Sequence, residues 1–196
     1  LPLGAAGVLI LWLGWFGFNG GSVLSADPTL TSLTLVTTCL AAAAGGVSAA
    51  FFASLLYKNY DITMFMNGVL GGLVGITAGA DLMSPTDSIL IGIFAGIFVV
   101  LGISLIEKLK LDDPVGAIAV HLICGIWGTL AVGCFGDLAG TDQFFIQLSG
   151  VAIIGAFCVI TSFILLFIVK AVTGLRVSEE EEKKGLDLSE HSMEAY

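Results

Sequence analysis

Residues 88–106 read SILIGIFAGIFVVLGISLI, an apolar run that contains no charged side chain. At about 1.5 Å per residue, a helix of this length nearly crosses a hydrocarbon core roughly 30 Å thick. Further apolar runs of comparable or greater length occupy 3–21, 30–56, 62–80, 114–135 and 145–171. We therefore expect an all-α, polytopic membrane protein that crosses the bilayer about six times.

The composition supports the same class. Hydrophobic residues make up 57% of the 196 residues, charged residues only 12%, and the mean hydropathy is +1.02. A soluble domain of this size does not need so much apolar surface. The cysteines show no CxxC spacing and lie in or near apolar runs, so we expect small buried residues and neither a metal nor a cofactor; they are Cys39, Cys124, Cys134 and Cys158.

The basic residues predict the orientation. Lysine and arginine occur only in alternate connections and after the last span, at Lys58, Lys108, Lys110, Lys170, Arg176, Lys183 and Lys184. The other connections carry aspartate and no base. Because Lys and Arg of short loops are retained in the cytoplasm, we expect a membrane region over 1–173 that starts inside the cell. Residues 174–196 would then form a cytoplasmic tail of a multi-pass protein of the plasma or inner membrane.

His121 is the ionisable residue that stands out within a span. Asp113 and Pro114 predict an N-cap and a first helical position, which would place His121 about 10 Å into the fifth span. Residues at helical spacing from His121 are small, namely Ala117, Cys124, Gly125 and Gly128. A neutral imidazole there can exchange a proton without a fixed buried charge. A packing histidine is the main alternative, and a metal site with Cys124 lacks further ligands.

An aromatic cluster lies at the outer end of the first span. It contains Trp12, Trp15, Phe16, Phe18 and Asn19, followed by Gly20, Gly21 and Ser22. Aromatic residues at this level often form an interfacial belt. The alternative is a cation site, in which ring faces attract an ammonium-like ion and a serine hydroxyl accepts one of its hydrogen bonds. Asn19 between aromatics favours a mouth over a belt.

Four segments carry a family resemblance. They are GWFGFNGGS at 14–22, NGVLGGLVGITAG at 67–79, DDPVGAIAVHLICG at 112–125, and the tail with GLRV at 174–177 and GLD at 185–187. In this order they resemble the ammonium transporter family (Amt/Mep/Rh), over essentially the whole chain. The resemblance implies a homotrimer of eleven-helix protomers with inverted five-helix repeats, a device general to transporters. This chain resembles helices six to eleven, the second half of a protomer, and Leu1 in place of Met agrees with a missing beginning.

The resemblance also implies roles for single residues. Ser22 matches the residue that hydrogen-bonds ammonium in the outer vestibule, and Phe18 matches one of two stacked gate phenylalanines. Trp15 matches the tryptophan below the gate, and His121 the second of two histidines at mid-membrane. The partners of these residues belong to the first half, so this chain alone is not expected to conduct. Leu122 stands where many members have glycine.

The tail shows a capping signal and acidic residues. Ser178 and Glu181 predict a capping box for a short helix with Glu179–Lys183 and Glu180–Lys184 pairs, ended by Gly185. A solvated charge run is the simpler interpretation. The resemblance implies a regulatory tail, carried by Gly174, Arg176, Gly185 and Asp187, to which a PII-type signalling protein can bind.

The function implied is ammonium or ammonia transport, with no nucleic acid involved. Two other classes of function compete with transport. An ammonium sensor would share the pore architecture but usually carries a fused signalling domain, which is not expected after Tyr196. A membrane enzyme would need a nucleophile, a metal cluster or paired buried carboxylates in the spans, and the spans contain none. A gas-type Rh channel is the closest alternative within the superfamily.

Overall fold

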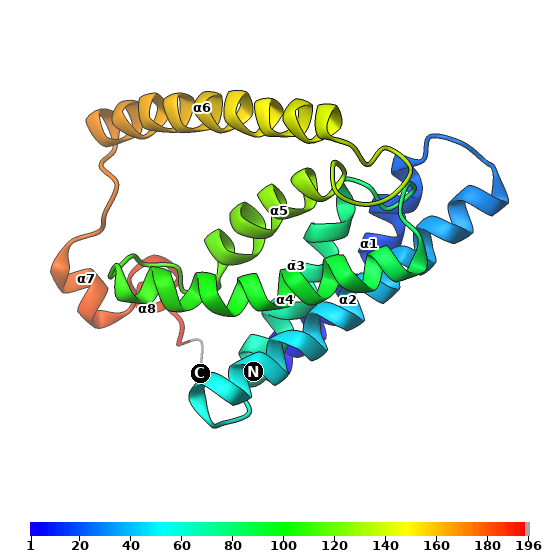
Figure 1. Cartoon of the computed structure of the whole chain (residues 1–196). Helices are drawn as coiled ribbons and strands as arrows, with labels where there is room; N and C mark the ends of the chain where they lie inside the picture. The colour runs from blue at the N-terminus through cyan, green and yellow to red at the C-terminus, as the bar shows by residue number, and fades with distance from the viewer. Residues whose placement is uncertain (195–196) are drawn as a thin grey trace. The chain divides into compact units, whose positions relative to one another are not determined.

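The computed structural model describes residues 1–194 and is helical, with no strand in that range. It divides into two compact units, Leu1–Val151 and Ala152–Tyr196. The first unit holds α1 (Pro2–Ser22), α2 (Pro28–Tyr57), α3 (Ile62–Thr77), α4 (Pro85–Lys108), the π-helix η1 (Ile118–Ile123), α5 (Cys124–Ala131) and the start of α6 (Thr141–Val172) (Figure 1). The all-α fold is confirmed.

Each predicted apolar run contains a helix. By length and composition, α1, α2, α4 and α6 are able to cross a bilayer. Two helices are shorter than the runs that predicted them: α3 ends at Thr77 rather than residue 80, and the fifth run forms helix only from Ile118 to Ala131. Residues 78–82 and 132–135 instead form turns at the ends of these helices.

Side-chain caps fix where several helices begin. The Asp27 carboxylate accepts hydrogen bonds from the backbone N–H groups of Thr29 and Leu30 at 2.8 and 3.4 Å, and Pro28 follows at the first helical position. Asp61 caps α3 in the same way. The Thr63 hydroxyl, 2.6 Å from Asp61, is the main cause that lowers the pKa of this carboxyl, although partial burial opposes it.

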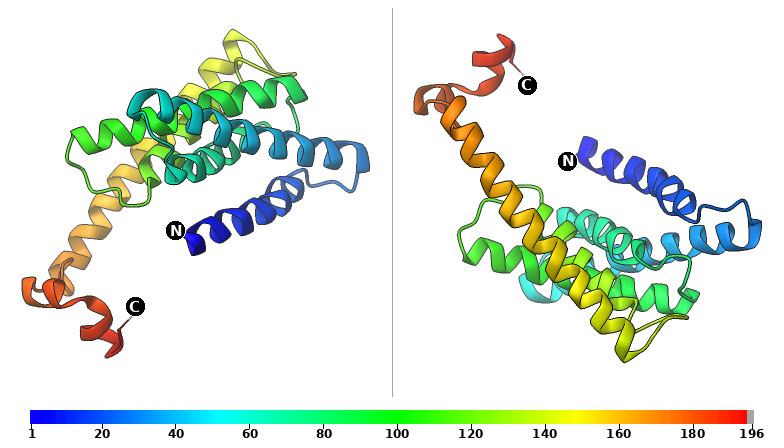
Figure 2. Two further views of the ribbon diagram at one scale, coloured as in Figure 1. Left: turned by 90° about the horizontal axis from the view of Figure 1, so that it is seen from below. Right: turned by 90° about the horizontal axis from the view of Figure 1, so that it is seen from above.

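Close backbone contact holds α2 against α3 and α4, which lie alongside it (Figures 1 and 2). At Gly72 of α3, a Cβ atom would meet the Ala41 carbonyl group of α2, with the carbonyl carbon only 2.9 Å away and the Ala42 Cα 3.1 Å away. At Gly92 of α4, a Cβ atom would meet the same Ala41. Glycine is therefore required where these helices approach most closely.

The fifth span begins differently from the sequence prediction, which placed its first helical residue at Pro114. The Asp113 carboxylate does act as a cap, but it accepts from the N–H groups of Ala117 and Ile118, at 2.7 and 2.9 Å. Gly116 takes a left-handed conformation with φ +73°, which L side chains disfavour, and this turn delays the helix to Ile118. The prediction of a helix start at Pro114 was wrong because it did not include this turn.

The second unit contains the rest of α6, then α7 (Glu179–Lys184) and α8 (Leu186–His191). No residue of α6 is buried, and its apolar side chains are exposed along its length. The predicted tail over 174–196 is described as far as residue 194, and its last two residues, Ala195 and Tyr196, lie outside the described residues.

Candidate functional site

A hollow of about 340 Å³ lies on the first unit, between three segments. α1 contributes Trp15 and Phe18, and the end of α3 contributes Val74, Thr77 and Ala78. η1 and α5 contribute His121, Gly125 and Thr129. Three of the four predicted pore residues, Trp15 and Phe18 with the distant His121, therefore line one surface. Its wall is mainly apolar, with an imidazole and two hydroxyl groups as the polar exceptions besides the indole N–H.

Trp15 is held in place by a hydrogen bond to the neighbouring helix. Its Nε1–H donates to the Thr77 hydroxyl oxygen at 2.8 Å, and that hydroxyl donates to the Leu73 carbonyl oxygen at 2.7 Å. The indole ring also contacts Phe18, with ring centroids 5.5 Å apart and planes tilted by 58°. The aromatic pair thus presents fixed ring faces and edges to the hollow.

At the C-terminal end of α1, Phe18 lines the hollow and Ser22 does not. Phe18 is 59% exposed, so its ring stands at the edge of the hollow, and Ser22 does not line it. The Ser22 hydroxyl donates to the Phe18 carbonyl oxygen at 2.7 Å, one helical turn back. Serine oxygen lone pairs remain available to accept from a ligand. Ser22 thus lies one turn beyond the Phe18 edge, at the end of α1.

Asn19 occupies a different environment from the mouth that we expected. It is 2% exposed, and its side-chain amide donates to the Thr38 hydroxyl of α2 at 3.0 Å. The prediction was wrong because helical spacing turns this residue away from Phe18 and toward α2. Asn19 joins α1 to α2 inside the protein. These two helices form a helical hairpin (Figure 2).

His121 lies in the π-helix rather than in a regular α-helix. π-turns widen the helix by one residue and are frequent at functional sites. The Cys124 side chain is buried and donates weakly to the Ala95 carbonyl oxygen at 3.5 Å, and Gly128 packs against Gly75. Of the small residues expected on the His121 face, Gly125 lines the hollow and these two face the bundle. A joint metal site of His121 and Cys124 has no support in this arrangement.

The sequence did not single out the two hydroxyl residues of the hollow, Thr77 and Thr129, or the apolar Val74 and Ala78. Thr129 follows His121 at the spacing of about two helical turns, with Gly125 between them, so its position on that face was detectable from helical periodicity. Thr77 carried no such signal, because its role depends on the contact between α1 and α3.

A larger hollow of about 530 Å³ lies along α2 and α4. Its lining is apolar except for Ser48, whose hydroxyl already bonds to the carbonyl oxygens of Gly45 and Ile93, at 3.1 and 3.0 Å. The groove offers no free polar chemistry. The functional candidate is therefore the smaller hollow with His121.

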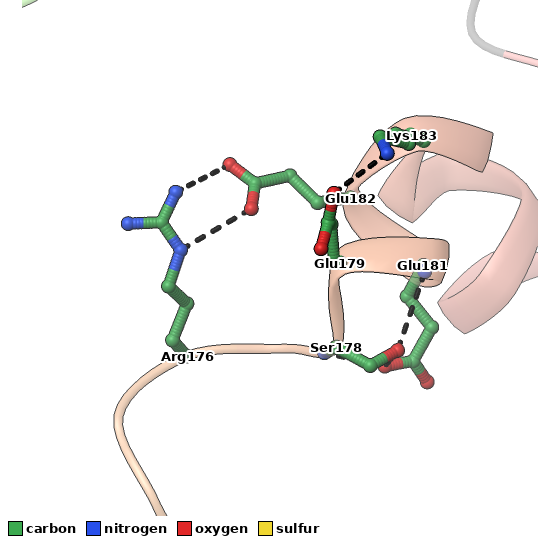
Figure 3. A network of polar contacts seen from close by, with 6 residues as sticks. All are labelled: Arg176, Ser178, Glu179, Glu181, Glu182 and Lys183. Atoms are coloured by element: carbon green, nitrogen blue, oxygen red, sulfur yellow. Dashed lines mark hydrogen bonds and ion pairs between the residues drawn. The ribbon is translucent and has the colours of Figure 1, made fainter.

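The tail forms a polar network (Figure 3). Ser178 and Glu181 make the predicted capping box: the Ser178 N–H and hydroxyl donate to the Glu181 carboxylate at 2.9 and 2.7 Å, and the Glu181 N–H donates back to the Ser178 hydroxyl oxygen at 3.3 Å. Lys183 pairs with Glu179 at 2.6 Å, as expected. The predicted Glu180–Lys184 pair is not formed in the described part of the tail.

The predicted regulatory residues occupy turns and an ion pair. Arg176 holds both carboxylate oxygens of Glu182, at 2.7 and 3.2 Å. Gly174 and Gly185 both have positive φ, +81° and +96°, and α7 ends at Gly185 as predicted. Asp187 lies in the first turn of α8. Arg176, which precedes α7 in the sequence, therefore holds the helix through an ion pair with Glu182.

The tail helix is expected to loosen in acid. The Ser178 hydroxyl is the main cause that lowers the pKa of Glu181, and the Arg176 guanidinium lowers the pKa of Glu182, both from an ordinary value of 4.5. Carboxylates with lowered pKa stabilise the fold above their unfolded pKa and lose that effect as the pH falls through the folded pKa. Hydrogen exchange of the α7 amides should accelerate below about pH 4.5 relative to the intrinsic rate. A Ser178→Ala variant should exchange fast already at neutral pH, whereas Glu180→Gln should behave as wild type; equal exchange in all three proteins would contradict the box.

Comparison with known proteins identifies the family of this chain. The model of the Ammonium Transporter Family matches residues 1–196. The ammonium transporter Amt2 of Archaeoglobus fulgidus is 42% identical over 213 aligned positions, which cover 100% of this chain and 46% of that protein. Amt2 of Methanocaldococcus jannaschii is 40% identical, with coverage of 100% and 46%.

Solved structures agree with these relatives. A structure described as a Sensor Amt Protein superposes with a TM-score of 0.92 at 37% identity, covering 96% of this chain and 49% of that one. Mep2 of Candida albicans superposes with a TM-score of 0.84 at 26% identity, covering 90% and 43%. The chain thus spans about half the length of the relatives it matches. Its sequence and its helical fold together make this chain a member of the ammonium transporter family.

Proposed function

We propose that the protein containing this chain transports ammonium or ammonia across a membrane. The observation that carries the proposal is the hollow in which Trp15 and Phe18 of α1 come together with His121 of η1. Relatives named as ammonium transporters support the substrate. Transport needs no catalytic group, and we propose no enzymatic activity.

The wall of the hollow suits the passage of a small neutral molecule. A bare ion crossing an apolar path loses its hydration, which is prohibitively unfavourable. Ser22 and the ring of Phe18 would partly replace the water shell of an ammonium ion at the outer end. Release of a proton then lets ammonia enter past Trp15 toward His121, whose imidazole can exchange a proton with it. Potassium has no proton to lose and is rejected by the same barrier.

We also propose the setting of this transporter. It is a homotrimer in the plasma or inner membrane, and this chain forms six crossings and a cytoplasmic tail, as the positions of the basic residues indicate. A PII-type protein would bind at the cytoplasmic face beside the tail residues Gly174, Arg176, Gly185 and Asp187. The opposing histidine and gate phenylalanine would come from the half of the protomer outside this sequence.

Reconstituted full-length protein tests the proposal. Liposomes that contain it should give a transient current, or a change of internal pH, when ammonium is added outside, and no signal with potassium at equal concentration. Protein-free liposomes provide the background of passive ammonia permeation. Flux equal to that background would contradict transport.

An ammonium sensor is the second candidate. The favouring observation is the high structural similarity to the protein described as a Sensor Amt Protein, with a TM-score of 0.92. A sensor binds ammonium through the same vestibule without net flux, so retained binding with no flux would favour it. A pH change without current would instead favour an electroneutral gas channel of the Rh type.

A further inference from the structure

The hydroxyl groups of the hollow differ in what they still can bind. A threonine hydroxyl has one proton to donate and two lone pairs that accept. Both Thr77 and Thr129 donate that proton to a carbonyl oxygen of their own helix, to Leu73 at 2.7 Å and to Gly125 at 2.8 Å. Each therefore faces the hollow as an acceptor.

Thr77 already uses one of its two acceptor lone pairs for protein structure. Trp15 donates its indole N–H to the Thr77 oxygen at 2.8 Å, and this bond joins α1 to α3. Thr129 lines the same wall, and no group within residues 1–194 donates to its oxygen. Of the two hydroxyl groups on this wall within residues 1–194, Thr129 is thus the one whose two lone pairs are both open to a ligand.

Thr129 and His121 lie one after the other along the same helical segment. Both lie on one face of the continuous η1–α5 segment, with Gly125 between them at the spacing of one turn from each. Glycine leaves the path between them open. A molecule that moves along this face meets the Thr129 oxygen and the imidazole in succession.

We infer that Thr129 is a binding residue for the conducted molecule, and that its hydroxyl oxygen accepts an N–H hydrogen bond from ammonia or a small primary amine. The inference rests on the proposed function, which makes a small N–H donor the occupant of the hollow. The bond offsets part of the hydration that the molecule loses on entering the apolar wall. Thr129 thereby favours N–H donors over apolar molecules of similar size.

Two substitutions separate this role from packing. Thr129→Val keeps the shape of the side chain and removes the acceptor, and Thr129→Ser keeps the acceptor and removes a methyl group. In full-length protein in liposomes, we expect Thr129→Val to slow ammonium-driven flux about threefold to tenfold, the usual range for one hydrogen bond. Thr129→Ser should stay within about twofold of wild type. If Thr129 only packs, the flux should instead be slowed more by Thr129→Ser than by Thr129→Val.

A matched control and a second measurement complete the test. Thr161 of α6 makes the same bond, to the Phe157 carbonyl oxygen at 2.7 Å, outside the hollow, so Thr161→Val should match wild type. Equilibrium binding of labelled methylammonium to the detergent-solubilised protein should weaken by the same factor in Thr129→Val. Binding and flux that are both unchanged in Thr129→Val would overturn the inference. If the wild-type protein gives no flux but still binds methylammonium more tightly than Thr129→Val does, transport is contradicted and the role of Thr129 is supported.

Discussion

Replacing His121 by alanine is expected to abolish the ammonium-specific current or to make the path permeable to potassium. Among residues 1–194, the imidazole is the one titratable side chain that lines the hollow. A positioned histidine that transfers protons typically contributes a factor of about 10² or more to a rate. Removing it leaves a gap that water and hydrated ions can enter. The measurement is the solid-supported-membrane current of the full-length protein with ammonium and with potassium.

The other histidine of the chain provides the control for this experiment. His191 ends α8 in the tail, far along the sequence from the hollow, and His191→Ala should keep the current and its selectivity. An unchanged ammonium current with full rejection of potassium in His121→Ala would show that the imidazole only packs, which was the main alternative from the sequence.

A valine at Gly72 should strongly destabilise the membrane region. Its Cβ atom would stand 2.9 Å from the Ala41 carbonyl carbon, which is backbone and cannot rotate away. Relief of the overlap requires α2 and α3 to separate, and overpacking of this kind costs about 3 kcal/mol. We expect a much lower midpoint of thermal unfolding for the detergent-purified protein, or loss of the monodisperse species.

A glycine in an open environment is the matched comparison. Gly155 of α6 has nothing within 4 Å of a built Cβ atom. Gly155→Val should therefore leave the unfolding midpoint close to that of wild type. Equal midpoints for the two valine variants would mean that the approach of α2 and α3 does not limit stability.

Local sequence signals predicted much of this fold. Apolar runs located all the long helices, because a membrane helix satisfies its backbone internally and needs only length and hydrophobicity. Ser178 with Glu181 and Gly185 set the two ends of α7, since caps depend on residues within one turn. The family resemblance brought Trp15, Phe18 and His121 together as pore residues, and the structure places them on one wall.

Other features depend on contacts between distant segments and could not be read from local patterns. Asn19 is directed to Thr38 of α2, and Trp15 to Thr77 of α3. The Cys124 side chain is buried in the bundle, where it directly follows the π-helix. Regular α-helical spacing predicted it on the same face as His121. The late start of the fifth span follows from the backbone of Gly116.

The π-helix around His121 also constrains how this segment can change length. One extra residue is accommodated between the turn at Gly116 and the regular helix from Cys124. Deleting a single residue between His121 and Cys124 would restore ordinary α-helical winding, which keeps the direction of the chain upstream but moves His121 to a different angular position relative to α5. The imidazole would then leave the wall on which Gly125 and Thr129 remain. The number of residues in this short stretch thus acts as a spacer that sets the direction of His121, independently of which side chains fill it.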